Sequence, residues 1–507
     1  MRSLPLRLMV AALVLSGCRS TGLTPTASTP VQLDAPTQGL FDMPWSDRSV
    51  FRAGLAESQQ SVLGRLPGAS VYHLALEIAP DLATVDGEQQ VLYTNTESVA
   101  LDRVALHLLP NLLGGELTLL AVRLDGKDVK PAYGEGEGSI TIPLDPALAP
   151  GASIVIGIDF RVKVPQDLEV NYGVLANASG VLAYAHGYPM VAVYDADGWN
   201  LDVPPPYGDV TYADASFYLV RVRAPSDLVL CGSGSELSRS ESGDQQEVLL
   251  AAGPARDFYL AASRGYRTAS KAIGEVTLRS CSPEGTEARA ERMLEIAARA
   301  LEFFGEQYGD YPYTKLDVVT TPTYALGIEY PGAFALTDRL FTANQDFGDL
   351  SEEVLLESVT AHEAAHEWFY NLVGNDQIDD PWLDEALAQF ATLQYYEDRY
   401  GEQGAAGMRD SFYGRWDRVG REPIPIGKPV GAYSEEAYSA IVYGRGPLFF
   451  EALEKGLGAK PFEELLRAYV AAFAWEEATP QDLQRMAEAQ CGCDLIALFN
   501  EWVYAQP

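Results

Sequence analysis

The apolar pattern of the chain changes near residue 266, and this change constrains the fold more than any other feature. Over 45–265, short segments such as VYHLALEIA and SIVIGIDFRV alternate apolar and polar residues between clusters of Gly, Pro, Asn and Asp. Over 266–507, apolar residues mostly recur at helical spacing. Alternation indicates strands and the 3.6-residue period indicates helices. We therefore predict an α+β protein, with an N-terminal antiparallel β-sheet domain, saddle-shaped or sandwich-like, followed by a mainly helical domain with a small sheet.

The second half carries three long helical patterns and one clear strand. The strand is KLDVVTTP at 315–322, and the tail from residue 444 onward adds further helices. The three long patterns are EARAERMLEIAARALEFFGEQYG from Glu287, EEVLLESVTAHEAAHEWFYNLVG at 352–374 and PWLDEALAQFATLQYYEDRY at 381–400.

The N-terminus has the pattern of an export signal. Residues 1–18 combine two Arg, the apolar run LMVAALVL and the ending LSGC, which resembles a bacterial lipobox with Cys18 as the lipidated residue. A stray Cys in an ordinary signal peptide is the alternative. Residues 19–44 are rich in Ser, Thr and Pro and indicate a flexible tether. We expect a protein anchored by lipid in the bacterial cell envelope, at the outer membrane or cell surface, because Arg19 replaces the Asp typical of inner-membrane retention.

The charge balance excludes one class of partner. The chain has 71 acidic against 36 basic residues, a formal net charge of −35. Such a surface repels phosphate backbones, so no binding to nucleic acid is expected. The acidity could attract cationic substrates or could serve only solubility.

Four cysteines besides Cys18 could form disulfides in an exported protein. They allow three pairings, and the sequence does not choose among them. Cys491 and Cys493 stand only two positions apart, which predicts single thiols or bridges to other partners rather than a bridge to each other. The other two are Cys231 and Cys281.

The segment HEAAH at 362–366 carries the clearest chemical signal. Residues four apart lie on one face of a helix, so His362 and His366 can present ring nitrogens to one ion. Glu363 then lies beside that ion without ligating it. This is the HExxH pattern, in which two His bind zinc and the Glu acts as general base of a hydrolase.

A catalytic zinc needs a third protein ligand and an open position for water. Glu385 follows on the next predicted helix, flanked by apolar residues where an unpaired charge would be costly. We predict one Zn²⁺ per chain, bound by His362, His366 and Glu385. Asp384 could support the site from the outer shell or could be a solvated residue at a helix start. The remaining histidines lie in the β-like half and are expected to be satisfied or exposed; they are His73, His107 and His186.

The stretch HEAAHEWFYNLVGN with WLDEALAQF resembles the zinc signature of the gluzincin aminopeptidases of the aminopeptidase N and leukotriene hydrolase type. That resemblance implies a thermolysin-like catalytic domain over 266–507. LGIEYPGAF at 326–334 resembles the family strand whose Glu holds the free α-amino group of a peptide, here Glu329, with Gly327 beside it at the substrate. Ile328 and Tyr330 depart from the usual Met and Asn.

A second stretch, AYSAIVYGRG at 437–446, resembles the family segment that carries two active-site tyrosines. Tyr443 matches the tyrosine whose hydroxyl stabilises the oxyanion, and Tyr438 matches a second tyrosine at the substrate. Arg445 replaces the usual Lys, which keeps the charge but changes its geometry.

The resemblance implies a zinc aminopeptidase that removes N-terminal residues from peptides with a free N-terminus. A gluzincin endopeptidase and a non-catalytic peptide-binding envelope lipoprotein are the alternatives. Larger family members add a C-terminal helical domain over the active site. Because this chain ends at Pro507, close to the predicted end of the catalytic domain, we expect a more open cleft or a protein partner that closes it.

Overall fold

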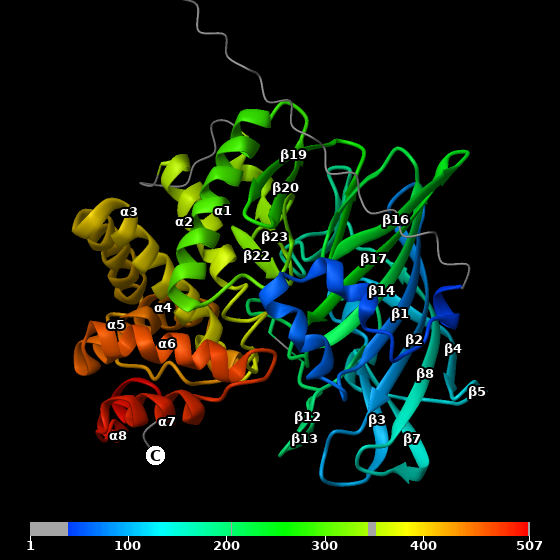
Figure 1. Ribbon diagram of the computed structural model, residues 1–507, viewed down its shortest axis with the longest axis horizontal. Coiled ribbons are helices and arrows are strands. Elements are labelled where there is room, and N and C mark those ends of the chain that lie inside the picture. Colours follow the sequence, from blue (N-terminus) through cyan, green and yellow to red (C-terminus); the bar gives the residue numbers. More distant parts are fainter. Residues whose placement is uncertain (1–38, 204, 343–350, 505–507) are drawn as a thin grey trace, which may run out of the picture.

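The computed structural model describes residues 39–203, 205–342 and 351–504 (Figure 1). A β-rich part lies on the right in this view and helices gather on the left. Cys18, the predicted signal peptide and most of the predicted tether lie outside the described residues. Within them, no helix combines the length and apolarity needed to cross a membrane.

The largest sheet of the β-rich part has eight strands. Six of its seven pairings are antiparallel, and β1 and β14 pair in parallel. The predicted antiparallel β domain is thus confirmed, with one parallel pairing that the sequence did not indicate, because alternation determines which face a strand buries but not its neighbour. In spatial order the strands are β16 (Ser235–Ser242), β17 (Gln245–Ala255), β14 (Ser216–Pro225), β1 (Val71–Ile78), β2 (Thr84–Thr94), β8 (Ser153–Lys163), β4 (Glu116–Leu124) and β5 (Lys127–Asp128).

Two four-stranded sheets and a hairpin complete this part. The first sheet is β15 (Val229–Gly232), β18 (Leu260–Ser263), β10 (Val181–Tyr184) and β9 (Leu175–Ala178). The second is β11 (Met190–Val191), β3 (Leu101–His107), β7 (Ser139–Leu148) and β6 (Ala132–Tyr133). The hairpin is β12 (Tyr194–Asp195) with β13 (Gly198–Trp199).

A five-stranded mixed sheet joins the two parts of the molecule. Its order is β19 (Tyr266–Ile273), β20 (Val276–Pro283), β21 (Lys315–Thr321), β23 (Ala333–Thr337) and β22 (Gly327–Tyr330). Ile328 and Tyr330 of the edge strand β22 belong to the apolar core of the β-rich part. Successive side chains of a strand point to opposite faces. Gly327 and Glu329 therefore face the helices, and this alternation places them at the site described below.

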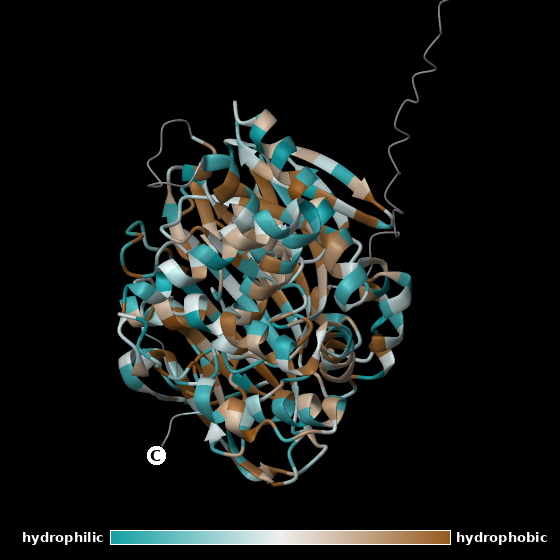
Figure 2. Cartoon of the chain, turned by 90° about the vertical axis from the view of Figure 1, so that its left-hand side faces the viewer, coloured by the Kyte–Doolittle hydropathy of each residue, from teal (hydrophilic) through white to brown (hydrophobic). Residues whose placement is uncertain are grey.

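Helices α1 and α2 pack on the other face of that sheet, and the eight α-helices of the described residues together form the second large core. Figure 2 views this side, where hydrophilic and hydrophobic residues alternate along the helices, as expected for amphipathic helices on an apolar interior. The helices are α1 (Glu287–Tyr308), α2 (Glu352–Ala365), α3 (Trp382–Asp417), α4 (Glu435–Ala440), α5 (Gly446–Leu457), α6 (Ala459–Phe473), α7 (Pro480–Cys491) and α8 (Ile496–Trp502). The β-rich part followed by a helical part confirms the predicted α+β class.

Two helices differ from their predicted bounds. Helix α2 ends at Ala365 rather than near Gly374, because the chain then forms wide turns in which Tyr370 has a φ of 129°. Apolar residues are buried in these turns as they would be in a helix, so the pattern does not distinguish the two. Helix α3 continues beyond Tyr400 to Asp417, across a kink at Gly401, where φ is 64°.

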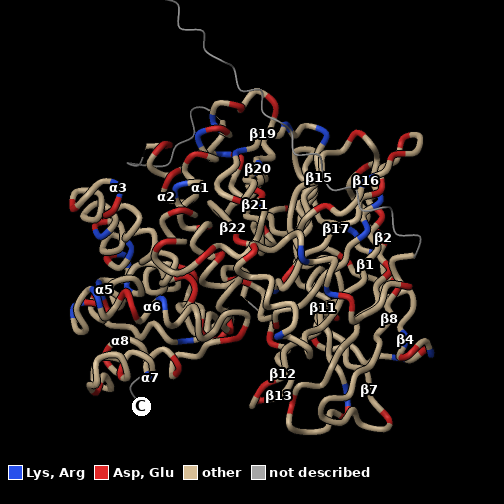
Figure 3. Tube along the Cα trace, in the orientation of Figure 1, with Lys and Arg blue, Asp and Glu red and all other residues tan. Residues whose placement is uncertain are grey.

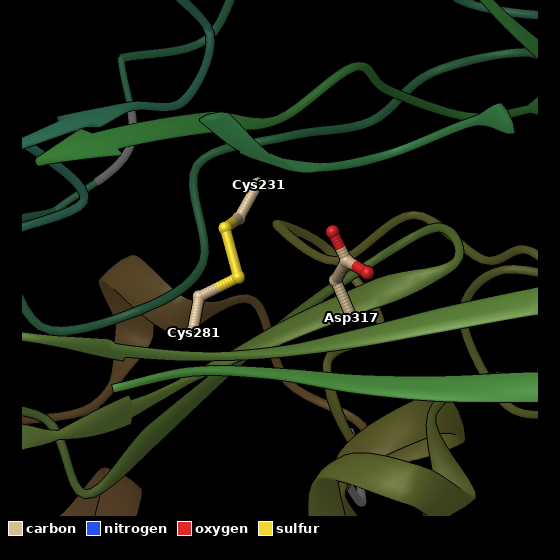
Figure 4. A group of neighbouring side chains, drawn as sticks. All are labelled: Cys231, Cys281 and Asp317. Atoms are coloured by element: carbon tan, nitrogen blue, oxygen red, sulfur yellow. A yellow bond between two sulfur atoms is a disulfide. The ribbon is translucent and has the colours of Figure 1, made fainter. Parts of the chain in front are cut away.

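The described residues contain two disulfides. Cys231 of β15 and Cys281 of β20 join the β-rich part to the five-stranded sheet, next to the buried Asp317 (Figure 4). The second bridge links Cys491 to Cys493, so the prediction that these two would not pair is wrong. Gly492 between them has a φ of 61°, which turns the chain at the end of α7 and brings the two Cα atoms to 5.2 Å.

Acidic residues are spread over both parts of the molecule rather than confined to one segment (Figure 3). The excess of negative charge is thus a property of the whole surface, and the site described next adds further carboxylates in its interior.

Candidate active site

Helices α2 and α3 bring the three predicted metal ligands together. His362 lies in the last turn of α2 and His366 directly after that helix, and their Nε2 atoms are 3.2 Å apart. Oε2 of Glu385, in the first turn of α3, lies 3.2 Å from Nε2 of His362 and 3.6 Å from that of His366. Two imidazoles and one carboxylate, all buried, therefore face one point.

This arrangement fits a zinc ion. In a tetrahedral site with bonds of about 2.0–2.1 Å, donor atoms lie about 3.3 Å from one another, close to the three separations of 3.2, 3.2 and 3.6 Å. Oε2 of Glu385 is buried and accepts no hydrogen bond from the described residues. A buried carboxylate oxygen without a partner is costly unless a cation occupies the site.

Neighbouring groups orient the ligands. Nδ1 of His366 lies 2.9 Å from the carbonyl oxygen of Phe369. Since a carbonyl only accepts, Nδ1 carries the proton and the lone pair of Nε2 points toward the site. The turn that ends α2 early thus fixes the tautomer of the second ligand. The other oxygen of Glu385, Oε1, accepts a 2.6 Å hydrogen bond from the hydroxyl of Tyr443.

Asp384 is fully buried, which excludes the solvated alternative. Its Oδ1 accepts a 2.8 Å hydrogen bond from the backbone N–H of Glu385, and its Oδ2 accepts one of 2.7 Å from Nε2 of Gln377. Burial and the charge of Glu385 raise the pKa of Asp384 to about 7. Asp384 therefore helps to fix the start of α3 and with it the third ligand.

Glu363 lies between the ligands and the edge strand β22. A Cβ added at Gly327 would come within 2.2 Å of Oε1 of Glu363, so only glycine leaves room for this carboxylate. Oε2 of Glu363 is buried and accepts no hydrogen bond from the described residues. Burial, reinforced by the charges of Glu329 and Glu385, raises the pKa of Glu363 well above its usual range. A carboxylate in such surroundings is a strong proton acceptor.

Glu329 lies on the same face of β22 and close to the metal ligands. Its carboxylate, Nε2 of His366 and the carboxylate of Asp384 offer donor atoms within 4.8 Å of one another. Oε1 of Glu329 also accepts a 3.1 Å hydrogen bond from Nε2 of Gln377. Burial raises the pKa of Glu329. The site thus holds a second carboxylate that does not need to bind the metal.

Sequence reasoning missed two residues of this cluster. Asp209, from the loop before β14, has a carboxylate oxygen within 4.8 Å of Glu329 and Glu385. Gln377, from the segment between α2 and α3, hydrogen-bonds Glu329 and Asp384 and accepts a 3.1 Å hydrogen bond from Thr211. Neither belongs to a spacing pattern, because tertiary packing alone brings these loops to the site.

Both predicted tyrosines line the same region. Tyr443 lies in a π-helical turn, Ile441–Arg445, between α4 and α5, and such turns recur at functional sites. Burial and the charge of Glu385 raise its pKa well above the usual range, so the phenol keeps its proton. Tyr438 packs edge-on against Tyr443 with ring centres 5.7 Å apart, and its buried hydroxyl has no partner among the described residues. Arg445 instead points away and donates to backbone carbonyls that include Trp502.

Glu329, Glu363 and the two tyrosines line one cavity of about 1050 Å³, together with the ligands His362 and Glu385. It extends from the segment Tyr324–Glu329 past the metal ligands and along α2 and α3. Asp209 and Arg415 also line it. A cavity of this size accommodates several residues of a peptide.

Comparison with known proteins relates part of the chain to a known family of peptidases. Residues 292–502 match the Peptidase family M1 domain. Aminopeptidase 2 of Candida albicans is 25% identical over 89% of this chain and 48% of its own length. A probable aminopeptidase 2 of Sulfurisphaera tokodaii is 23% identical over 52% of this chain and 35% of its own length. The chain thus spans about half or less of these curated relatives.

Solved structures share the fold. An M1 zinc metallopeptidase from Deinococcus radiodurans superposes with a TM-score of 0.64 at 19% identity, covering 87% of this chain and 94% of that protein. A mutant of the same metallopeptidase, bound to the substrate Tyr-Ser-Ala, superposes equally well with a TM-score of 0.64, at 20% identity over 87% of this chain and 95% of that protein. Residues 292–502 thus match the M1 domain of the gluzincin aminopeptidases, and the chain shares the fold of M1 zinc metallopeptidases.

Proposed function

We propose that the protein is a zinc-dependent aminopeptidase that releases N-terminal residues from peptides. The observation that carries this proposal is the position of Glu329, a buried carboxylate within 4.8 Å of the ligand His366. A carboxylate fixed so close to the metal would pair with the terminal ammonium group and place the first peptide bond at the metal. A chain interior has no ammonium to offer, so this position favours cleavage at the N-terminus over cleavage at internal bonds.

The residues that surround the ligands divide the chemistry among them. Zn²⁺ held by His362, His366 and Glu385 would supply Lewis-acid chemistry, polarising the scissile carbonyl and lowering the pKa of water. Glu363 accepts a proton at its free Oε2 from the attacking water and passes it to the leaving amine. Its raised pKa suits both transfers, because the protonated form is stable long enough to act as an acid.

Tyr443 and the carboxylates of Glu329 and Asp209 contact the substrate itself. The phenol of Tyr443 keeps its proton and can turn from Glu385 to donate to the carbonyl oxygen as negative charge develops there. Glu329, with Asp209 next to it, binds the ammonium group. Tyr438 and Gly327 border the same space, the first by its unpartnered hydroxyl and the second by leaving room for Glu363.

Blocking the substrate's N-terminus tests this function directly. We expect N-acetylation of a tripeptide to lower kcat/KM by roughly 100-fold or more, since a charge-assisted interaction with Glu329 is lost. The measurement is the initial rate of release of the first residue from matched free and acetylated peptides. Equal rates for both peptides would favour an endopeptidase and remove Glu329 from its proposed role.

A matched variant separates the charge of Glu329 from its shape. Glu329→Gln should lower kcat/KM for the free peptide, while the slow cleavage of the acetylated peptide stays as it is. Zinc content should not change, because Glu329 is not among the ligands. Absence of any hydrolysis by zinc-loaded wild-type protein would instead support the non-catalytic, peptide-binding alternative.

We also propose that Cys18 carries a lipid that holds the protein at the bacterial outer membrane or cell surface. The support is the sequence LSGC at the end of the apolar run, followed by Arg19. Cys18→Ser is expected to abolish incorporation of radiolabelled palmitate and to shift the protein from the membrane to the soluble fraction of the cells that produce it. A membrane-bound, unlabelled variant would contradict this proposal, and Cys231→Ser serves as the control that leaves labelling intact.

A further inference from the structure

One cation of the cavity has no carboxylate partner within the part of the chain that the structure describes. Arg415 lies on α3 beyond the kink at Gly401, and its guanidinium carbon is 5.7 Å from the centre of the Tyr443 ring. A Cβ at Gly444 would approach Cβ of Arg415 to 3.0 Å, so the glycine of the π-helical turn permits this close packing. Arg415 is therefore held beside the tyrosine that we place at the scissile carbonyl.

The other cation that lines the cavity, Arg292, behaves differently. Its guanidinium forms ion pairs with Glu353 at 2.6 Å and with Glu295 at 3.2 Å. Among the described residues, no carboxylate lies within ion-pair distance of Arg415, and its guanidinium donates no hydrogen bond. Burial lowers the pKa of Arg415, with Tyr443 opposing that effect. The Arg415 side chain is half-buried in the cavity wall, so its guanidinium is available to a ligand that supplies an anion.

Arg415 and Glu329 lie near different metal ligands. The ring of Tyr443, which Arg415 contacts, lies 6.3 Å from the ring of His362, whereas the carboxylate of Glu329 lies within 4.8 Å of a ring nitrogen of His366. Ser358 and Val359, one turn before His362 on α2, continue the cavity lining on the His362 side. If Glu329 binds the ammonium group, the chain beyond the scissile bond runs past His362 and toward Arg415.

We propose that Arg415 binds a carboxylate of the peptide on its leaving-group side, and that the enzyme therefore prefers short peptides with a free C-terminus. This inference rests on the proposed function. Consecutive Cα atoms are about 3.8 Å apart, so the C-terminal carboxylate of a di- or tripeptide ends one or two residues past the scissile bond, near this guanidinium. An Asp or Glu side chain at the first residue after that bond is the second source of the same chemistry.

Matched peptides and variants test the proposal. The substrates are Tyr-Ser-Ala, its C-terminal amide, and the pair Tyr-Asp amide and Tyr-Asn amide. The proteins are the zinc-loaded wild type, Arg415→Gln, Arg415→Lys and the control Arg418→Gln, whose exposed side chain lies outside the cavity lining on the same helix end. Zinc content and melting temperature are measured for each, and kcat and KM are determined separately.

We expect the wild type to favour the free acid over the amide by about 10-fold or more in kcat/KM, mainly through KM. Arg415→Gln should lose this preference while cleaving the amide at the wild-type rate, and Arg415→Lys should keep part of it because it keeps the charge but not the planar fork. Arg418→Gln should behave as wild type. A preference for Tyr-Asp amide over Tyr-Asn amide that depends on Arg415 would assign the side chain as the source of the carboxylate.

Two results would overturn the proposal. One is a wild type that shows neither preference, cleaving Tyr-Ser-Ala like its amide and Tyr-Asp amide like Tyr-Asn amide. The other is an Arg415→Gln variant whose kcat falls equally for Tyr-Ser-Ala and its amide, which would place Arg415 in the chemistry at Tyr443. Calorimetric binding of Tyr-Ser-Ala and its amide to zinc-loaded Glu363→Gln tests the same site without turnover. Peptides that bind with an Arg415-dependent preference but are not cleaved by wild type would contradict the proposed function and leave this inference standing.

Discussion

Glu363→Gln is expected to keep one zinc per chain and to lower kcat by about 1000-fold. Glutamine has the shape of glutamate, so it fits the space beside Gly327, but its amide cannot accept the proton of the attacking water. The substitution does not change the metal ligands His362, His366 and Glu385, so the distances between their donor atoms stay the same. Metal analysis of the purified variant, together with steady-state rates on a free tripeptide, checks both halves of this expectation.

Two further variants make the test specific. Glu352→Gln removes a carboxylate from the first turn of the same helix, where it pairs with Arg289 at 3.1 Å outside the cavity lining, and should leave the rate unchanged. Tyr443→Phe should keep the metal and lower kcat by about 100-fold, since one donor to the developing oxyanion is lost. Loss of zinc from Glu363→Gln, or turnover close to wild type, would contradict the role of Glu363 as the base.

Glu385→Ala is expected to lose the metal and with it nearly all activity. Three donors hold the ion, and removing one leaves two imidazoles alone. Because exchange of even an outer-shell partner weakens binding by about 10- to 100-fold, loss of a direct ligand should weaken it further. The measurement is zinc retained after dialysis against a chelator of known affinity, followed by the rate before and after excess zinc is restored.

The exposed Glu397, further along α3, gives the matched control, because Glu397→Ala removes a carboxylate from the same helix without touching the cavity. Stoichiometric zinc in Glu385→Ala after dialysis would mean that another carboxylate of the cluster is the third ligand. The candidates are the nearby carboxylates of Asp209, Glu329 and Asp384. The alanine variant of each would then show which of them binds the metal.

Local spacing explains why the metal ligands could be predicted from the sequence. His362 and His366 are one helical turn apart, so both can face one ion, whereas Glu385 lies in the first turn of the next helix, where its apolar neighbours make an unpaired charge costly. The strand alternation in β22 likewise predicts that Gly327 and Glu329 share a face. The resemblance to the gluzincin aminopeptidases added the two tyrosines, which the structure places at the same cavity.

Other features could not be read from local patterns. The early end of α2 depends on turns around Tyr370 that bury the same apolar residues as a helix would. The bridge between Cys491 and Cys493 depends on the left-handed conformation of Gly492. The extension of α3 past Gly401, which carries Arg415 to the cavity, contradicts the helix-ending character of glycine.

The sequence by itself predicted the α+β class, because residue periods of two and 3.6 indicate strands and helices, and it predicted the cluster of His362, His366 and Glu385 with Glu363 beside it. The two histidines and Glu363 follow from their spacing along one helix, whereas Glu385 on the next helix was inferred because a zinc site needs a third ligand. Only the tertiary structure decided that Asp209 and Gln377 join Glu329, that β1 pairs in parallel with β14, and that Arg415 has no carboxylate partner among the residues that the structure describes. These are contacts between segments far apart in the chain. They are fixed by how the two apolar cores pack around the five-stranded sheet, and a local pattern carries no information about that packing.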